Sequence, residues 1–134
     1  MSLSPADRLD IIDVVTRADA AATARDVDGY VACFTDTARI VGAMGEHDGT
    51  DALRRDVGPI WASEGAATAH LCLNAVIDEE GDGRAQVRSI LLIVASSQPF
   101  TPLGMSAITQ NLVRTGDGWK IAVRAVHDLG SGGP

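Results

Sequence analysis

The sequence predicts an α+β domain in which N-terminal helices pack on one face of a curved antiparallel sheet. Three observations lead to this fold class. Apolar residues recur at helical spacing in the first half of the chain. From Ala67 onwards they form long runs separated by glycine-rich turns, as in a series of hairpins. The length of 134 residues suits one domain with its own core. We expect that domain to span residues 1–129, with a flexible glycine-rich tail over residues 130–134.

A long amphipathic helix is expected over residues 5–25. Ser4 can cap its N-terminus, Pro5 suits the first turn, and Asp7 lies near the positive end of the helix dipole. The apolar positions expected to face the core are Leu9, Ile12, Val15 and then Ala18 or Ala22.

The next segment is expected to contain two shorter helices and one short strand. Asp26 can cap the second helix, and Arg39–Val41 resembles a strand. Residues 42–49 are rich in loop-forming residues, and Thr50 can cap the third helix. Gly58 and Pro59 should kink or break that helix. The remainder is expected to form four strands, over residues 68–77, 84–96, 105–115 and 119–128.

Both faces of the predicted sheet are rich in apolar side chains. In the first long strand, strict alternation places His70, Cys72 and Asn74 on one face and Leu71 and Leu73 on the other. A sheet with one covered face alternates more cleanly between apolar and polar residues. We therefore expect a second copy of the chain to cover the outer face, giving a homodimer.

Composition excludes several classes of partner. Lys and Arg number 11 against 18 Asp and Glu, a net charge of −7. Such a chain lacks the basic surface that binding to nucleic acids or to anionic membranes requires. The longest apolar run, Ile90–Ala95, is too short to span a bilayer, and the N-terminus lacks the pattern of a signal peptide. We expect a cytoplasmic protein whose two cysteines, Cys33 and Cys72, are buried thiols.

Several short motifs occur in an order that resembles one superfamily. They are Arg25–Tyr30 followed by Phe34–Asp36, Gly49–Leu53, His70 with Asn74, Gly83–Ala85, and Leu112–Ile121 with Arg124. Together they cover nearly the whole chain and resemble the SnoaL-like branch of the nuclear-transport-factor-2-like superfamily. That branch includes polyketide cyclases and scytalone-dehydratase-like proteins, and ketosteroid isomerases are more distant relatives.

The resemblance implies a cone-shaped, cystatin-like fold around an apolar pocket. It also implies a small, flat, hydrophobic ligand, dimerisation through the outer sheet face, and proton transfer beside a carbonyl without a cofactor. Such chemistry needs a base of suitable pKa and hydrogen-bond donors for an enolate oxygen. We find no spacing among the histidines that is typical of a metal site. The polar cluster Gly45–Gly49, which contains His47, is expected to be the loop that enters the third helix, and such a loop can edge the pocket mouth.

His70 is the candidate acid/base residue, because it matches a pocket histidine of the dehydratase-like members. In those members an aspartate late in the first helix orients the histidine, and that position is Thr23 here. The resemblance therefore implies that His70 lacks its orienting carboxylate. The ketosteroid isomerase pattern also fails, since its tyrosine, base and buried acid fall near Ala18, Gly42 and Gln110.

Other polar residues can replace the missing groups. The candidates for ligand binding are Asp19, Thr23, Asn74, Arg88 and Gln110. Each also has a structural or solvent-exposed interpretation, and Arg88 suits a dimer interface equally well. Two hypotheses follow. The chain is a cofactor-independent dehydratase, isomerase or cyclase centred on His70, or it is a non-catalytic binding or accessory domain that has lost the family's catalytic residues.

Overall fold

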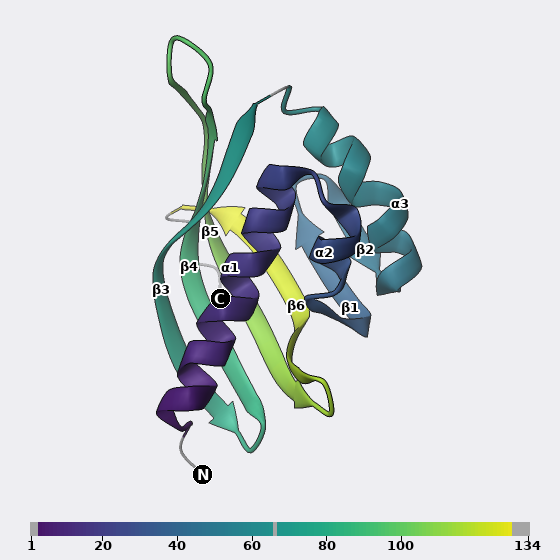
Figure 1. The fold of residues 1–134 in the computed structure, drawn as a ribbon, viewed down its shortest axis with the longest axis vertical. Coiled ribbons are helices and arrows are strands. Elements are labelled where there is room, and N and C mark those ends of the chain that lie inside the picture. The colour runs from purple at the N-terminus through teal and green to yellow at the C-terminus, as the bar shows by residue number, and fades with distance from the viewer. Residues whose placement is uncertain (1–2, 66, 130–134) are drawn as a thin grey trace.

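The computed structural model describes residues 3–65 and 67–129, so the expected tail lies outside the described residues. Within them the chain forms three helices and six strands (Figure 1). Their bounds in chain order are α1 Pro5–Ala24, α2 Val27–Val31, β1 Phe34–Gly42, β2 Gly45–Asp48, α3 Gly49–Ala62, β3 Thr68–Gly81, β4 Arg84–Ala95, β5 Thr101–Thr115 and β6 Gly118–Asp128.

The strands form one sheet in the order β2-β1-β6-β5-β4-β3. Neighbouring strands are antiparallel except β1 and β6, which are parallel. The predicted α+β fold is confirmed, and the sheet is mixed rather than fully antiparallel. The parallel pair is possible because β1 and β6 are joined by most of the chain rather than by a hairpin. β2 was not predicted, since its four residues lie in a segment that is rich in turn-forming residues.

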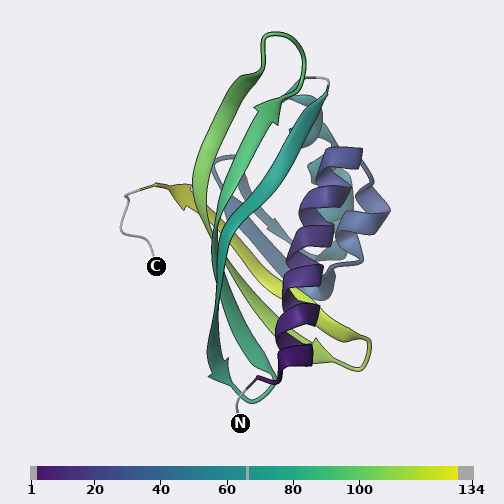
Figure 2. The same ribbon diagram turned by 60° about the vertical axis from the view of Figure 1, so that its left-hand side comes forward.

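The helices lie on one side of the curved sheet (Figure 2). Helix α1 crosses that face and contacts β3 and β6, and α3 packs against β1 and β2. The buried face of α1 is formed by Ile11, Val15 and Ala18, whereas Leu9 is 73% exposed. The predicted apolar stripe was therefore wrong at its start, because Ile11 rather than Leu9 or Ile12 is the first buried residue of the helix.

The predicted caps have mixed outcomes. Ser4 and Asp7 form a capping box at the start of α1, and the side chain of Asp26 accepts a hydrogen bond from the Gly29 N–H at the start of α2. The prediction for α3 was wrong, because the helix begins at Gly49 after Asp48 and not after Thr50. It also continues through Pro59 to Ala62. Pro59 has no N–H to donate to the Arg55 carbonyl, so the helix continues with one backbone hydrogen bond missing.

Two β-bulges change which side chains point inward. In β3, Leu73 pairs with Ile90 but Val76 pairs with Arg88, so β3 contains one extra residue. In β6, Ile121 pairs with Leu112 and Val123 pairs with Asn111 on β5. Two residues of β6 are therefore advanced for one residue of β5, and β6 also contains one extra residue. A bulge shifts the alternation by one residue and exchanges the two faces beyond it. Both bulges therefore affect the composition of the sheet's inner face.

The outer face of the sheet carries apolar side chains in register. Leu71, Leu92 and Met105 lie side by side on β3, β4 and β5. Two residues further along β3, Leu73 pairs with Ile90. Leu71 and Leu73 are each 39% exposed and Met105 is 56% exposed.

Among the described helices, none is long and apolar enough to cross a membrane.

Candidate functional site

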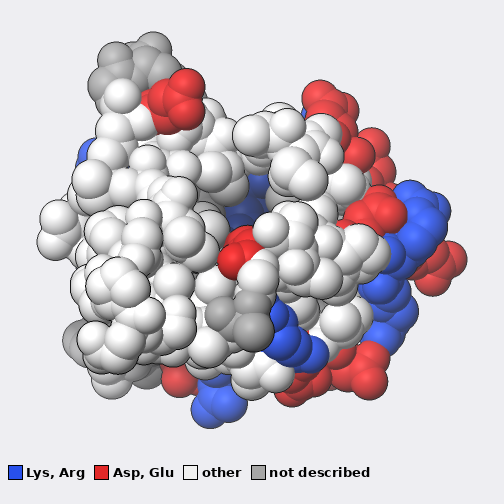
Figure 3. Space-filling view, turned by 90° about the horizontal axis from the view of Figure 1, so that it is seen from above, with Lys and Arg blue, Asp and Glu red and all other residues white. Residues whose placement is uncertain are grey.

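A cavity of about 320 Å³ lies between the helices and the inner face of the sheet. Most of its wall is apolar, and its lining comes from both edges of the sheet as well as from α2 and α3. Figure 3 shows a hollow with atoms of Lys or Arg residues (blue) at its floor and atoms of Asp or Glu residues (red) beside it. The polar side chains that line the cavity are Tyr30, His47, Ser63, Glu64, His70, Ser106 and Arg124.

His70 lines this cavity from β3 and is hydrogen-bonded to the carboxylate of Glu64. Its Nε2 lies 2.8 Å from Oε1 of Glu64, and the two side chains are 6% and 14% exposed. An ionised carboxylate only accepts hydrogen bonds, so this contact assigns the Nε2 hydrogen to His70. The other ring nitrogen, Nδ1, then has the lone pair. The expectation that His70 lacks an orienting carboxylate is therefore corrected, because Glu64 takes that place.

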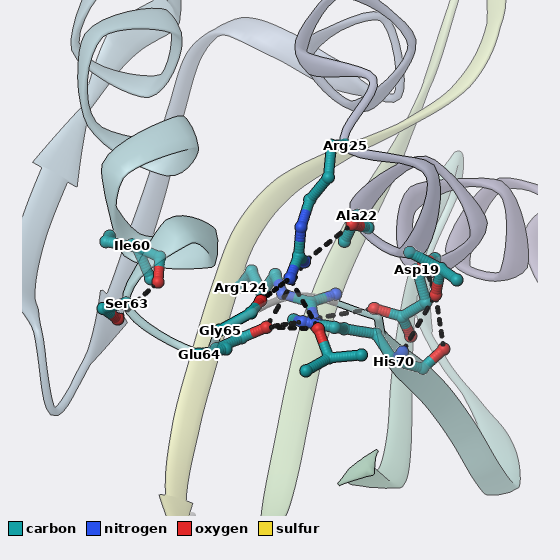
Figure 4. Close-up of polar contacts among 11 residues, drawn as sticks. Asp19, Ala22, Arg25, Ile60, Ser63, Glu64, Gly65, His70 and Arg124 are labelled. Carbon is teal, nitrogen blue, oxygen red and sulfur yellow. Dashed lines mark hydrogen bonds and ion pairs between the residues drawn. The ribbon is translucent and has the colours of Figure 1, made fainter. Parts of the chain in front are cut away.

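The end of α3 and a neighbouring arginine hold Glu64 in position (Figure 4). The Glu64 N–H donates to the carbonyl of Trp61 at the end of α3. Its Oε1 also accepts from Thr68 Oγ1 at 3.1 Å and from Arg25 Nη1 at 3.4 Å. Arg25 reaches this point because it ends α1 in the left-handed conformation, with φ of 58°. The carboxylate is thus fixed by three donors from two segments, His70 and Thr68 on β3 and Arg25 at the end of α1.

Thr23 positions the backbone of His70 and does not line the cavity. Its Oγ1 accepts a hydrogen bond from the His70 N–H at 2.9 Å, and it also donates to the Asp19 carbonyl at 3.0 Å. The hydroxyl therefore ties β3 to α1 at the histidine. This contact explains how threonine can occupy a position where the resemblance implied an aspartate.

Arg124 is a buried cation at the wall of the cavity. Its Nη2 donates to Asp19 Oδ1 at 2.9 Å and its Nη1 donates to Gln110 Oε1 at 3.2 Å. The side chains of Arg124 and Asp19 are each 5% exposed, and Gln110 is fully buried. Asp19 and Gln110, which we expected to bind the ligand, do not line the cavity but anchor the residue that does.

The charge on Arg124 is retained in spite of burial. Burial by itself lowers the pKa of Arg124, whereas the Asp19 carboxylate raises it through its charge and its hydrogen bond to the guanidinium. The guanidinium carbon lies 6.0 Å from the centre of the Tyr30 ring. Burial raises the pKa of the Tyr30 hydroxyl, which therefore stays neutral at ordinary pH. The cavity thus contains a permanent positive charge beside mostly apolar walls.

A second histidine lines the same cavity from β2. The Nδ1 of His47 lies 2.8 Å from Oδ2 of Asp56 on α3. Asp56 also accepts two hydrogen bonds from Arg55, at 2.8 and 3.0 Å. The sequence placed His47 only at the pocket mouth and gave no sign of its carboxylate partner.

Two of the expected ligand-binding residues lie away from the cavity. Asn74 is exposed at the β3 bulge, where its φ is 56°. Arg88 is also exposed and pairs with Asp78 at 2.8 Å. The expected positions were wrong for a physical reason in both cases. The bulge removes Asn74 from the face that His70 occupies, and Arg88 alternates with the inward-facing Val87 and Ser89.

Sequence reasoning did not select Glu64 or Arg124 for the site. Arg124 is a single charged residue within the apolar run Ala122–Val126, which is a signal of a buried functional position. Strict alternation from Trp119 and Ile121 would point it outward, and only the β6 bulge turns it inward. Glu64 lies in a Ser-Glu-Gly segment after a helix, where nothing distinguishes it from a surface residue.

The described residues contain no group of three His, Cys, Asp or Glu side chains that could hold a metal ion. A larger depression, of about 610 Å³, lies on the outside of the fold against α1 and α2. Its charged lining includes Asp13 and Arg17, which pair with each other on the exposed surface of α1. The cavity that contains His70 is the better candidate site, because its apolar walls carry a buried histidine and a buried arginine.

Comparison with known families agrees with this architecture. The model of the SnoaL-like domain matches residues 4–125, which is nearly the whole described chain. The chain belongs to the SnoaL-like domain family. None of the curated protein sequences compared with this SnoaL-like chain matches it.

Solved structures show the same fold at low sequence identity. A cystatin-like protein of unknown function from Nostoc punctiforme is 21% identical, with a TM-score of 0.89, over 98% of this chain and 97% of that one. Aln2 from a Streptomyces species is 15% identical, with a TM-score of 0.85, over 96% and 94%. A protein from Catenulispora acidiphila, in complex with S-DNPA, is 20% identical, with a TM-score of 0.78, over 92% and 94%. These similarities show that the SnoaL-like chain has the cystatin-like fold.

Proposed function

We propose that this SnoaL-like domain binds a small, mostly apolar ketone and transfers a proton beside its carbonyl without a cofactor. The observation that carries the proposal is the joint presence of the His70–Glu64 pair and the Arg124 cation at one apolar cavity. A base and a fixed positive charge are the two groups that enolisation of a ketone requires.

The size of the cavity indicates the size of the ligand. A cavity of roughly 150 Å³ accommodates benzene. The cavity here, at about 320 Å³, is about twice as large and suits a bicyclic molecule. α-Tetralone is such a molecule, with exchangeable protons next to its carbonyl. A neighbour of the same fold is known in complex with a small molecule, which supports a ligand-binding role without identifying the ligand.

The proposed reaction assigns a role to each of the three side chains. His70 takes the α proton, and the C–H electron pair moves through the new C=C bond onto the carbonyl oxygen. Arg124 stabilises the resulting enolate oxygen, and Asp19 and Gln110 keep its guanidinium in place. Glu64 stabilises the imidazolium that forms at His70. Return of the proton to carbon completes an isomerisation or an exchange.

Exchange of α protons in D₂O tests this proposal. We expect the wild type to accelerate deuterium incorporation into α-tetralone, measured by proton NMR. His70→Gln should slow the exchange by about 10²–10⁴-fold, the usual contribution of a general base, while calorimetric binding of α-naphthol is retained. Ser63→Ala is the matched control, because Ser63 lines the same cavity but its hydroxyl bonds only the Ile60 carbonyl.

Two results would count against the proposal in different ways. Binding of α-naphthol without any exchange by the wild type would support the alternative of a non-catalytic binding domain. Exchange that is equally fast in His70→Gln would remove the histidine from the mechanism.

We also propose that two copies of the chain pair through the outer sheet face. The support is the apolar row formed by Leu71, Leu92 and Met105, which are in register on three adjacent strands. A second copy presents the same row, so one contact would cover both. An exposed apolar patch of this kind is typical of an interface rather than of a free surface.

A further inference from the structure

Tyr30, the one tyrosine of the chain, lines the cavity that contains His70. It projects from α2, whose start is capped by Asp26. Its ring lies edge-on to that of Trp61, with the ring centres 5.1 Å apart, and its centre is 4.9 Å from that of the Phe34 ring. Only 4% of the residue is exposed. Two aromatic neighbours therefore hold the ring, and with it the position of the hydroxyl oxygen.

The Tyr30 hydroxyl forms no hydrogen bond to another described residue, although buried tyrosine hydroxyls usually have a partner. It is also not sealed inside the fold. Within the described residues, the side-chain polar atoms that are both enclosed and unpartnered are His47 Nε2, Ser89 Oγ, Gln110 Nε2 and His127 Nε2. Because the Tyr30 oxygen is not one of these, it opens onto the cavity that the residue lines. A molecule in the cavity can therefore supply its partner.

Arg124 lies beside the same hydroxyl but comes from β6. Its guanidinium carbon is 6.0 Å from the centre of the Tyr30 ring, and Asp19 and Gln110 hold its two terminal nitrogens. Burial raises the pKa of the Tyr30 hydroxyl by more than the Arg124 charge lowers it, so the hydroxyl keeps its proton at neutral pH. A guanidinium only donates hydrogen bonds, and a protonated phenol has one hydrogen to donate. Two donors from different elements thus border one cavity, and only an acceptor atom can bond to both.

We propose that Tyr30 is a catalytic residue, which donates its hydroxyl hydrogen to the same developing enolate oxygen that Arg124 stabilises. The inference rests on the proposed function and narrows its substrates to ketones whose carbonyl oxygen reaches the wall between α2 and β6 while the α carbon faces His70. The α proton moves to His70, the C–H electron pair forms the C=C bond, and the former C=O pair moves onto the oxygen. The Tyr30 hydrogen bond to that oxygen strengthens as the charge grows, and the phenol keeps its proton. Fixed donors of this kind stabilise the transition state more than the bound ketone.

The ionisation of bound α-naphthol measures this hydrogen bond directly, because α-naphtholate resembles the enolate of α-tetralone. From the absorbance spectrum of the complex, we expect wild type to ionise α-naphthol at a lower pH than solvent does. Tyr30→Phe keeps the ring and removes the hydroxyl. At a given pH it should reduce the ratio of bound naphtholate to bound naphthol by about 10- to 100-fold, the effect of one hydrogen bond to a charged group.

Two further readouts separate catalysis from packing. Tyr30→Phe should slow the α-proton exchange of α-tetralone by about 10²-fold, as expected for the loss of one such donor. Its calorimetric affinity for naphthalene, which has the same rings as α-naphthol but no oxygen, should equal that of wild type. Ser63→Ala is the matched control for the loss of a hydroxyl, and it should change neither the exchange nor the ionisation, since Ser63 bonds the Ile60 carbonyl.

Carbon NMR of the wild type tests the contact without any substitution. Tyrosine labelled with carbon-13 at Cζ gives one protein signal, because the chain contains one tyrosine. We expect α-naphthol to shift this signal more than naphthalene does. Equal shifts from the two ligands, or exchange and ionisation that are unchanged in Tyr30→Phe, would overturn this inference and leave the proposed function standing. Absence of exchange in the wild type would instead overturn the proposed function, and the catalytic role of Tyr30 with it.

Discussion

Asp19→Asn tests the role of the buried ion pair that holds Arg124 at the cavity. The change removes one charge while keeping the size of the side chain. Arg124 and Asp19 are each 5% exposed, and the raised pKa of Arg124 prevents it from losing its own charge. Removing one partner of a buried ion pair costs about 3–5 kcal/mol, because the other charge stays buried and uncompensated. We expect a loss of about 3 kcal/mol, since the amide oxygen can still accept a hydrogen bond from Arg124.

This free-energy change corresponds to a large shift in melting temperature. An unfolding entropy of about 2.1 cal/mol/K per residue gives a decrease of about 10 °C in Tm for a chain of 134 residues. The free energy of unfolding can be measured by urea titration with circular dichroism, and Tm by calorimetry. Asp13→Asn is the matched control on the same helix, because Asp13 pairs with Arg17 at the exposed surface. An exposed pair of this spacing contributes only about 0.3–0.5 kcal/mol.

A double variant distinguishes loss of charge balance from loss of packing. Adding Arg124→Met to Asp19→Asn removes the uncompensated cation, and we expect more than half of the lost stability to return. The reasoning is refuted if Asp19→Asn costs no more than Asp13→Asn, or if the second substitution makes the protein still less stable.

Two further predictions concern the dimer and the acid stability. Leu71→Glu places a charge in the apolar row of the outer face and should convert a dimer to a monomer in analytical ultracentrifugation. Leu9→Glu, on the exposed side of α1, should leave the dimer intact. A monomeric wild type would contradict this prediction. The backbone N–H of Ser4 is the main cause that lowers the pKa of Asp7 from 3.8 to about 2. The stabilising contribution of the Asp7 carboxylate is therefore complete above about pH 4 and is lost as the pH falls towards 2. The free energies of unfolding of wild type and Asp7→Asn, measured by urea titration, should differ at about pH 5 and converge near pH 2. A difference that persists at about pH 2 would show that the carboxylate charge is not responsible.

The elements of the fold were largely predictable from the sequence, because they depend on local patterns. The capping residues Ser4 and Asp26 marked the starts of two helices, and the glycine-rich turns marked the long hairpins. The parallel pairing of β1 with β6 was not predictable in this way. Residues far apart in the chain form it, and neither strand contains a signal for its partner.

The candidate site was predictable only in part. His70 was selected from a family resemblance, and its carboxylate partner was missed because Glu64 is positioned by the end of α3 rather than by a motif. Asn74 was misplaced and Arg124 was not selected for a shared reason. Each lies at or beyond a bulge, where one extra residue exchanges the two faces of the strand. Alternation alone cannot locate such a residue.

A crystal structure of the chain with α-naphthol tests the central claim most directly. We predict that the rings occupy the cavity of about 320 Å³ and that the hydroxyl oxygen lies within about 3.2 Å of a nitrogen of His70 or Arg124. Occupancy of the outer depression beside α1, with the inner cavity empty, would contradict the claim that this cavity is the functional site.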